Sequence, residues 1–314
     1  MISTTHKGEA ARPRSPILSA IRRRVPWLRG DTALAILVLS PSILAVAVFI
    51  YGFIVWTGYI STVKWDTVVK DYTSVGLQNW IRLFQMERFH WDLRSLALYA
   101  VGFMGQCILV GFLLAVLLDQ KIKGEAIFRT IFVFPFAVSA IVTGVAWRWL
   151  MQPTTGLNLL LQKIGFKNFY FAWNADPKWG ILAISLAAAW QFTGYIMSLY
   201  LAGLRGIPEE IREAARVDGA GTWALYRRII IPLLMPVTFT AVVLTGMGSI
   251  RVFDLVTLLR GPAFTTDTLA FHMYQSTFGL YRFAMGATIG FFMIFLSLFL
   301  VVPYLRSIQF EAER

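Results

Sequence analysis

The residues with the clearest potential for chemistry form one charged stretch between apolar runs. Residues 208–236 read PEEIREAARVDGAGTWALYRRIIIPLLMP, in a chain that is otherwise rich in hydrophobic residues. Its carboxylates and guanidinium groups can form ion pairs, and its small residues allow another backbone to approach closely. This stretch therefore has the composition of a surface that contacts a partner protein.

Motifs for catalysis are absent from the sequence. There is no G-x-x-x-x-G-K-[ST] phosphate loop, no H-E-x-x-H pair and no G-x-S-x-G nucleophile. His6, His90 and His272 are scattered, and Cys107 is the single cysteine, which rules out a disulfide within the chain. We expect a protein that is not an enzyme, binds no metal or cofactor itself, and lacks this ATP-binding motif.

The charged stretch predicts two short helices within a loop at 205–231. Pro208 suits a first helical position, where its missing N–H would be unpaired anyway. Glu209 and Glu210 follow in the first turn, where carboxylates favour the helix dipole. Gly219 is typical of a helix C-terminus, and Thr222 is expected to cap the second helix.

The elements around this loop are predicted to cross a membrane. The chain has 314 residues, of which 57% are hydrophobic and only 15% charged. A helix needs about 20 apolar residues to span the hydrocarbon core, and helices satisfy their own backbone hydrogen bonds there. We predict an all-α membrane protein with six transmembrane helices, from six stretches without Asp, Glu, Lys or Arg: 32–63, 95–118, 130–147, 179–204, 229–250 and 283–305.

The distribution of positive charge predicts the orientation. Six spans place both termini on one side, together with two of the loops, and that side carries 17 Lys and Arg residues against 10 on the other. The excess puts both termini in the cytoplasm. The predicted organisation is a basic N-terminal tail (1–31), a six-helix domain (32–305) and a short C-terminal tail (306–314). The tail contains Arg22, Arg23 and Arg24, and is expected to be either disordered or a short interfacial helix.

The charged loop resembles a known motif. Its pattern is E-A-A-x-x-D-G-A followed by I-x-x-P-x-x-x-P, between the fourth and fifth predicted helices. It resembles the "EAA" loop of permease subunits of ABC importers. The residues that carry the resemblance are Glu213, Ala214, Ala215, Asp218, Gly219, Ala220, Ile229, Pro232 and Pro236.

The resemblance implies a role for each part of the loop. In that family the loop is a coupling helix seated in a cleft of a separate ATP-hydrolysing subunit. Glu213 would contact a basic residue there, Ala214 and Ala215 would permit close approach, and Gly219 would set the bend. The residues by themselves leave a second interpretation open, a solvated hairpin whose Glu and Arg side chains pair among themselves.

Further segments resemble the carbohydrate-importing members of the family. They are VGLQNWIRLF (75–84), FRTIFVFPFAVS (128–139) and RVFDLVTLLRGP (251–262). The last departs from the family pattern at Arg260, where Gly or a polar residue is usual. The resemblance covers residues 32–305. It implies a second permease subunit, two ATPase subunits that bind ATP and Mg²⁺, an extracytoplasmic solute-binding protein and a prokaryotic inner membrane.

Candidate substrate-pathway residues lie in the third and fourth predicted spans. A sugar site needs aromatic faces for ring surfaces and hydrogen-bonding groups for hydroxyls. Gln191 and Tyr195 share a helix face at i, i+4 beside Trp190, and Ser139 and Thr143 share another. The alternative is that these polar side chains make ordinary hydrogen bonds between helices.

Arg251 and Asp254 lie three residues apart at the end of the fifth predicted span. We expect an ion pair within one helix. The functional alternative is a gate, or a contact with the solute-binding protein.

The sequence is also compatible with rival functions. A glycerol-phosphate ester or other polyol is an alternative solute, because Arg148 or Arg251 would suit an anion. A secondary transporter is the alternative of a different class. It would give the charged loop no role, and no matching halves are visible in the sequence.

Overall fold

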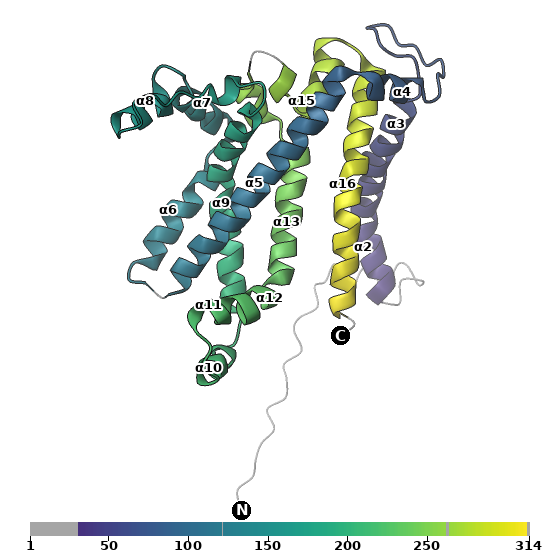
Figure 1. Cartoon of the computed structure of the whole chain (residues 1–314). Helices are drawn as coiled ribbons and strands as arrows, with labels where there is room; N and C mark the ends of the chain where they lie inside the picture. Colours follow the sequence, from purple (N-terminus) through teal and green to yellow (C-terminus); the bar gives the residue numbers. More distant parts are fainter. Residues whose placement is uncertain (1–30, 121, 262–263, 313–314) are drawn as a thin grey trace, which may run out of the picture. The chain divides into compact units, whose positions relative to one another are not determined.

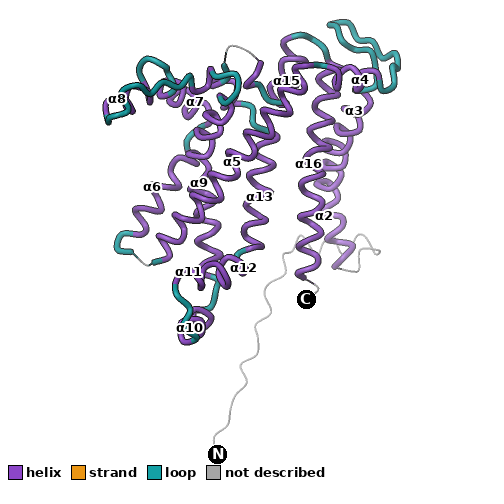
Figure 2. The backbone as a smooth tube through the Cα atoms, viewed as in Figure 1, coloured by secondary structure: helices purple, strands orange, loops and turns teal. Residues whose placement is uncertain are grey.

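The computed structural model describes residues 31–120, 122–261 and 264–312. These residues are largely helical and form no β-sheet; one isolated antiparallel bridge joins Val63 and Ser74 (Figures 1 and 2). The α-helices are α2 (Asp31–Val46), α3 (Phe53–Ile60), α4 (Gln78–Gln85), α5 (Glu87–Asp119), α6 (Glu125–Ala137), α7 (Ala140–Leu150), α8 (Gly156–Lys163), α9 (Gly180–Arg205), α10 (Glu209–Val217), α11 (Thr222–Leu225), α12 (Ile231–Leu233), α13 (Met235–Ile250), α14 (Asp254–Leu259), α15 (Leu269–Tyr274) and α16 (Phe283–Ala312).

Shorter helical turns interrupt or join these elements. Three are π-helical: η1 (Ala47–Gly52), η3 (Tyr226–Ile230) and η5 (Gln275–Gly279). Two are 3₁₀ turns: η2 (Trp173–Ala175) and η4 (Phe264–Thr266). The chain divides into two compact units, residues 1–56 and 57–314, and the second contains every element of the candidate site described below. The predicted basic tail lies outside the described residues up to residue 30.

The helices are long and apolar enough for a polytopic membrane protein. Four meet the length and composition required of a membrane span, Ala35–Ile60, Glu87–Asp119, Gly180–Arg205 and Phe283–Arg306. Two bent helix pairs, α6 with α7 and α12 with α13, raise the number of spans to as many as six. The predicted all-α membrane fold is therefore confirmed.

The third predicted span is not one continuous helix. The run 130–147 is broken between α6 and α7, whose axes differ by 97°. Pro135 lies near the end of α6 and has no N–H to donate to the preceding turn. Val138 is extended, and the Ser139 hydroxyl accepts a hydrogen bond from the Ile141 N–H at 3.3 Å, which starts α7. The chain therefore turns where a uniform apolar run predicted a straight helix.

The fifth predicted span is also bent. The segment Thr222–Leu233 meets α13 at 65°, with Leu234 at the break. Pro232 and Pro236 flank this residue, and each occupies the first turn of a helix, where proline is tolerated.

Helix α9 packs against both α5 and α6 (Figure 1). On the α5 side, Gly111 leaves room for Ile196; a Cβ at this glycine would lie 3.0 Å from an Ile196 methyl. On the α6 side, Gly194 lies directly against the Phe132 carbonyl, and a Cβ there would collide with it. Small residues let backbones approach closely, which is how helices pack in a membrane. The three helices form the frame of the site.

Helix α5 begins before the predicted span and carries charged residues in its first turns. Arg88 donates to Asp267 at 2.7 Å and to Gln275 at 2.6 Å. Asp92 is fully buried and hydrogen-bonded to His272 at 2.5 Å. Because these charges have partners, they are tolerated in the helix. Helix α5 therefore begins at Glu87, eight residues before the charge-free run that starts at residue 95.

Candidate functional site

The charged loop folds as the predicted pair of short helices. Helix α10 ends in a Schellman motif: the Ala220 N–H donates to the Ala215 carbonyl at 2.9 Å, and the Gly219 N–H to the Arg216 carbonyl at 3.0 Å. Gly219 has a φ of 81°, a left-handed conformation that glycine adopts without strain. The helix stop at Gly219 is therefore confirmed.

The starts of the two helices differ by one residue from the prediction. Pro208 is the N-cap of α10, with extended ψ, and the helix begins at Glu209. Gly221 is the N-cap of α11, so Thr222 is its first helical residue and not its cap. Both glutamates of the first turn of α10 lie where they were expected.

The glutamates of α10 are not paired with arginines of the loop. Within the described part of the chain, Glu209, Glu210 and Glu213 form no ion pair. Glu213 is exposed, with Ala214 and Asp218 exposed beside it. The pairing of these glutamates with arginines of the loop is therefore wrong, whereas the glutamates are exposed to solvent, as the interpretation of a solvated hairpin expected.

Ala215 does not share the exposed surface. Its relative exposure is 6%, and it belongs to the chain's own hydrophobic core. Of the two alanines assigned to close approach, only Ala214 faces outward. Ala220 and Ile229 pack partly against the same core, while Pro232 lies exposed in α12.

Two large exposed apolar side chains that the sequence reasoning did not select lie in the same hairpin. Val217 is 87% exposed at the end of α10, and Trp223 is 73% exposed in α11. The sequence indicates these two residues only by their apolar side chains within an otherwise charged loop. We name the exposed residues Glu213, Ala214, Val217, Asp218 and Trp223 the hairpin surface.

A cavity of about 280 Å³ lies away from the hairpin, against the middle of α5 and α9. Aromatic side chains from three helices line it, together with one amide, one guanidinium and one carboxylate. The lining includes Tyr99 and Phe103 of α5, Phe136 of α6, Gln191 and Phe192 of α9, Arg251 and Asp254. Gln191 and the pair Arg251 and Asp254, predicted from two separate segments, are thus brought to one cavity.

Arg251 and Asp254 are not an ion pair within one helix. Helix α13 ends at Ile250 with Arg251 as its C-cap, and Asp254 begins α14. No ion pair joins the two side chains among the described residues. The expected pair is wrong because the chain turns between them, and both side chains face the cavity instead.

Gln191 and Tyr195 both contact the bend between α6 and α7. The Gln191 amide donates to the Val138 carbonyl at 2.6 Å, satisfying an acceptor at the break. Tyr195 stacks on Phe136 with ring centroids 4.9 Å apart and an interplanar angle of 17°. Phe192 packs against both rings. These three rings form an aromatic cluster on the seam between α6 and α9.

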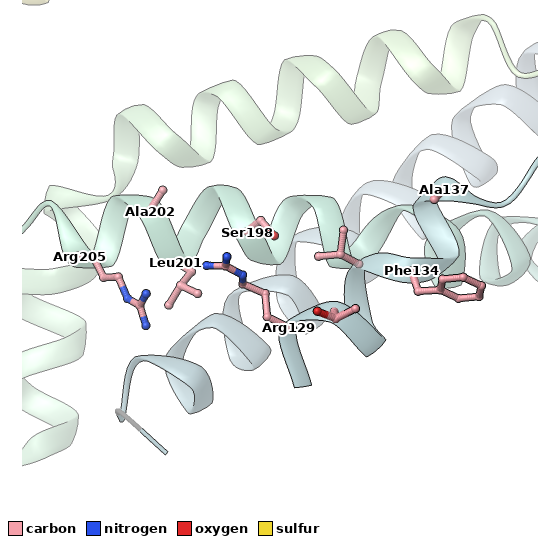
Figure 3. A pocket seen from close by; sticks show the side chains of 9 residues that line it. Arg129, Phe134, Ala137, Ser198, Leu201, Ala202 and Arg205 are labelled. Atoms are coloured by element: carbon pink, nitrogen blue, oxygen red, sulfur yellow. The ribbon is translucent and has the colours of Figure 1, made fainter. Parts of the chain in front are cut away.

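A larger groove of about 630 Å³ follows the same seam toward the hairpin (Figure 3). It is lined by Arg129, Thr130, Val133, Phe134 and Ala137 of α6, and by Ser198, Leu201, Ala202 and Arg205 of α9. Along α9, Tyr195 lies between the residues that line the cavity and those that line the groove. Two hollows therefore follow one seam, with the aromatic cluster between them.

The remaining candidates lie elsewhere. Trp190 is 46% exposed and packs edge-on against Trp147. Ser139 caps α7, and Thr143 is buried with its hydroxyl unpaired among the described residues. None of these three lines the cavity or the groove. The rings of Phe136 and Phe192, which the sequence reasoning missed, line the cavity instead.

Comparisons with known proteins define the class. Residues 107–308 match the family model described as a binding-protein-dependent transport system inner membrane component. The chain belongs to this family and is a multi-pass membrane protein of a transport system. The fold agrees: a chain of a bacterial alginate ABC transporter, in complex with an alginate pentasaccharide-bound periplasmic protein, superposes with a TM-score of 0.73 at 21% identity, covering 92% of this chain and 96% of that one.

Curated relatives belong to the same class. A probable ABC transporter permease protein of Pyrococcus horikoshii is 40% identical over 278 residues, covering 88% of this chain and 95% of the relative. The xylose/arabinose import permease protein XacH of Haloferax volcanii is 34% identical over 239 residues, covering 75% of each.

Proposed function

We propose that the chain is a permease subunit of an ATP-driven importer for a sugar, an oligosaccharide or a glycoside. It forms half of the translocation pathway, and a second permease subunit forms the other half. Two separate ATPase subunits bind ATP and Mg²⁺, and an extracytoplasmic solute-binding protein delivers the solute. The complex lies in the cytoplasmic (inner) membrane of a prokaryote.

The hairpin surface is the observation that carries this proposal. Glu213 is exposed, is unpaired in the described part of the chain and stands on a helix fixed by a Schellman motif. A carboxylate in this position suits a basic residue of a partner, and the apolar side chains of Val217 and Trp223 add area that a partner would bury. The family membership supports an ATPase subunit as that partner.

The cavity and the groove support the pathway for the solute. Aromatic rings suit the apolar faces of a sugar ring, and Gln191, Arg251 and Asp254 offer donors and acceptors for hydroxyl groups. Arg251 and Asp254 both line the cavity, so its lining carries one charge of each sign. The cavity therefore favours a neutral saccharide over a glycerol-phosphate ester. The xylose/arabinose permease among the relatives supports the same class of solute.

Alternating access would use the two hollows in turn. The cavity would receive solute from the binding protein, and the groove would release it toward the hairpin end. The aromatic cluster of Phe136, Phe192 and Tyr195 would separate them. Such a cycle needs two states that ATP and solute favour differently.

The test is purification of the tagged chain from native membranes in mild detergent, with co-purifying proteins identified by mass spectrometry. We expect a P-loop ATPase and a second permease. Glu213→Ala should leave the chain folded and inserted but weaken retention of the ATPase and lower uptake, because the charge is lost from an exposed site. Glu210→Ala, an exposed change on the same helix, is the matched control.

Three results would contradict the proposal. The first is a chain that purifies alone and transports solute without ATP. The second is normal uptake by the Glu213→Ala variant. The third concerns the solute: a purified binding protein that is stabilised thermally by glycerol 3-phosphate but by none of xylose, arabinose, lactose, maltose and trehalose would replace the sugar with the ester.

A further inference from the structure

Arg212 connects the hairpin to two long helices. Its side chain leaves α10 on the face opposite the hairpin surface and points into the body of the protein. One guanidinium nitrogen, Nη1, lies 2.8 Å from the Asp119 carboxylate, and Nη2 donates to the Leu204 carbonyl at 2.8 Å. The two side chains of the ion pair are only 13% and 7% exposed. This contact is therefore largely withdrawn from solvent.

Both partners of Arg212 lie at helix C-termini. Asp119 is the last residue of α5, where the helix dipole disfavours a carboxylate. Leu204 is the penultimate residue of α9, and its carbonyl accepts a long hydrogen bond from the Ile207 N–H at 3.3 Å. A guanidinium group placed between them neutralises the carboxylate and gives the carbonyl a second, shorter hydrogen bond. Removing it would leave a nearly buried carboxylate unpaired, which is costly.

Neighbouring arginines do not make the same connection. Arg212 and Arg216 line one hollow of about 290 Å³. Arg216 lies one turn further along α10, but it is exposed and forms no ion pair with any described residue. Arg205 pairs with Glu125 at 2.7 Å, but it joins α9 to α6 and is 42% exposed. Arg212 is thus distinguished by its burial and by bridging from α10 to both α5 and α9.

The helices that Arg212 joins also line the cavity, near the middle of each helix. Tyr99 and Phe103 belong to α5, and Gln191 and Phe192 belong to α9. The two helices pack closely along their length, with Gly111 against Ile196. Arg212 holds α10 to the C-terminal ends of α5 and α9. A displacement of α10 would therefore move together the two helices that form walls of the cavity.

We propose that Arg212 is the positioning residue that transmits movement of α10 to α5 and α9. It touches neither ATP nor solute in this scheme; it fixes the hairpin to the helices that line the pathway. The proposal rests on the coupling function proposed above.

The test uses the complex purified with its ATPase subunits and reconstituted in lipid nanodiscs. Spin labels at Glu210→Cys on α10 and Leu117→Cys on α5, both exposed positions, report the separation of the two helices. The background is Cys107→Ser, so that only the two introduced thiols react. With Arg212 present, we expect one narrow distance distribution that is the same without nucleotide and with ATP and vanadate. In Arg212→Met, we expect the distribution to broaden or shift on addition of ATP and vanadate.

Hydrolysis gives a second readout. Stimulation of ATPase activity by the co-purified binding protein should fall at least about five-fold in Arg212→Met, because a coupling free energy of ordinary size is lost. Arg216→Gln is the matched control and should behave as the unmodified chain. Asp119→Asn should resemble Arg212→Met, and the double variant should be no worse than either single one, because both remove one interaction. Arg212→Lys, which retains the charge but not the two-armed geometry, should lie between.

The outcomes separate the two proposals. A complex that does not retain an ATPase subunit even with the unmodified chain overturns the proposed function itself. A complex that retains the ATPase, but whose distance distribution and stimulated hydrolysis are unchanged in both Arg212→Met and Arg212→Lys, overturns the role of Arg212 alone. Equal losses in Arg216→Gln would also overturn it, because the effect would then belong to positive charge in general.

Discussion

At the scale of single residues, the conformation of the hairpin depends on Gly219. Its φ of 81° closes the Schellman motif and turns the chain from α10 toward α11. A Cβ at this position would meet no atom within 4 Å. The requirement for glycine is therefore one of backbone conformation and not of space.

Gly219→Val is expected to impair assembly with the ATPase subunit. A side chain in the left-handed conformation costs about 1–2 kcal/mol, and a β-branched residue is especially unfavourable there. The measurement is the fraction of chain that co-purifies with the ATPase, alongside the thermal stability of the chain alone. Gly219→Asn is the matched control, because asparagine adopts this conformation more readily. Equal assembly of the valine and asparagine variants would mean that the bend does not control docking.

At the scale of helices, the seam between α6 and α9 depends on contact of the two backbones. Gly194 faces the Phe132 carbonyl directly, four residues before Ser198 of the groove and three after Gln191 of the cavity. The separation of the two helices at this point fixes how the aromatic cluster closes the space between the hollows.

Gly194→Ala should destabilise the chain by about 1–3 kcal/mol, the usual cost of overpacking. The added methyl group must push α6 away from α9, which should also change uptake. The matched control is Gly105→Ala in α5, where a Cβ would meet nothing within 4 Å. That change should be neutral or stabilise the helix by up to about 1 kcal/mol. Thermal unfolding in detergent measures both, and equal melting temperatures would show that the α6–α9 contact is not tight.

The sequence predicts most of these helices but not how they bend. Charge-free runs identify the spans, because an unpaired charge in the bilayer is costly. The same rule places the start of α5 too late, since Arg88 and Asp92 find partners from residues more than 170 positions away. Pro135 and Ser139 are the local signals for the break between α6 and α7, but a uniformly apolar run conceals them. Burial of Ala215 depends on tertiary packing, which a helical periodicity does not specify.

At the scale of the whole molecule, the hairpin lies at the C-terminal ends of α5 and α9, and the cavity lies against the middle of both helices. The groove lies between them on the α6–α9 seam. Function in an importer requires the two ends of α5 and α9 to face opposite sides of the membrane. The hairpin end must face the side that contains ATP. The excess of Lys and Arg makes the same prediction, since the topology predicted from the sequence assigns 17 of them to the side of the hairpin and 10 to the other.

Labelling with a membrane-impermeant maleimide tests this orientation in intact cells. In a Cys107→Ser background, Val69→Cys lies 76% exposed in the loop before α4 and should react from outside. Trp223→Cys, 73% exposed in the hairpin, should react only after the membrane is permeabilised. Expression of the chain without its partners prevents an ATPase subunit from shielding the second thiol. If Trp223→Cys reacts in intact cells and Val69→Cys does not, the hairpin faces away from ATP. An ATPase could then not dock at Glu213. This result would contradict both the proposed coupling function and the proposed role of Arg212.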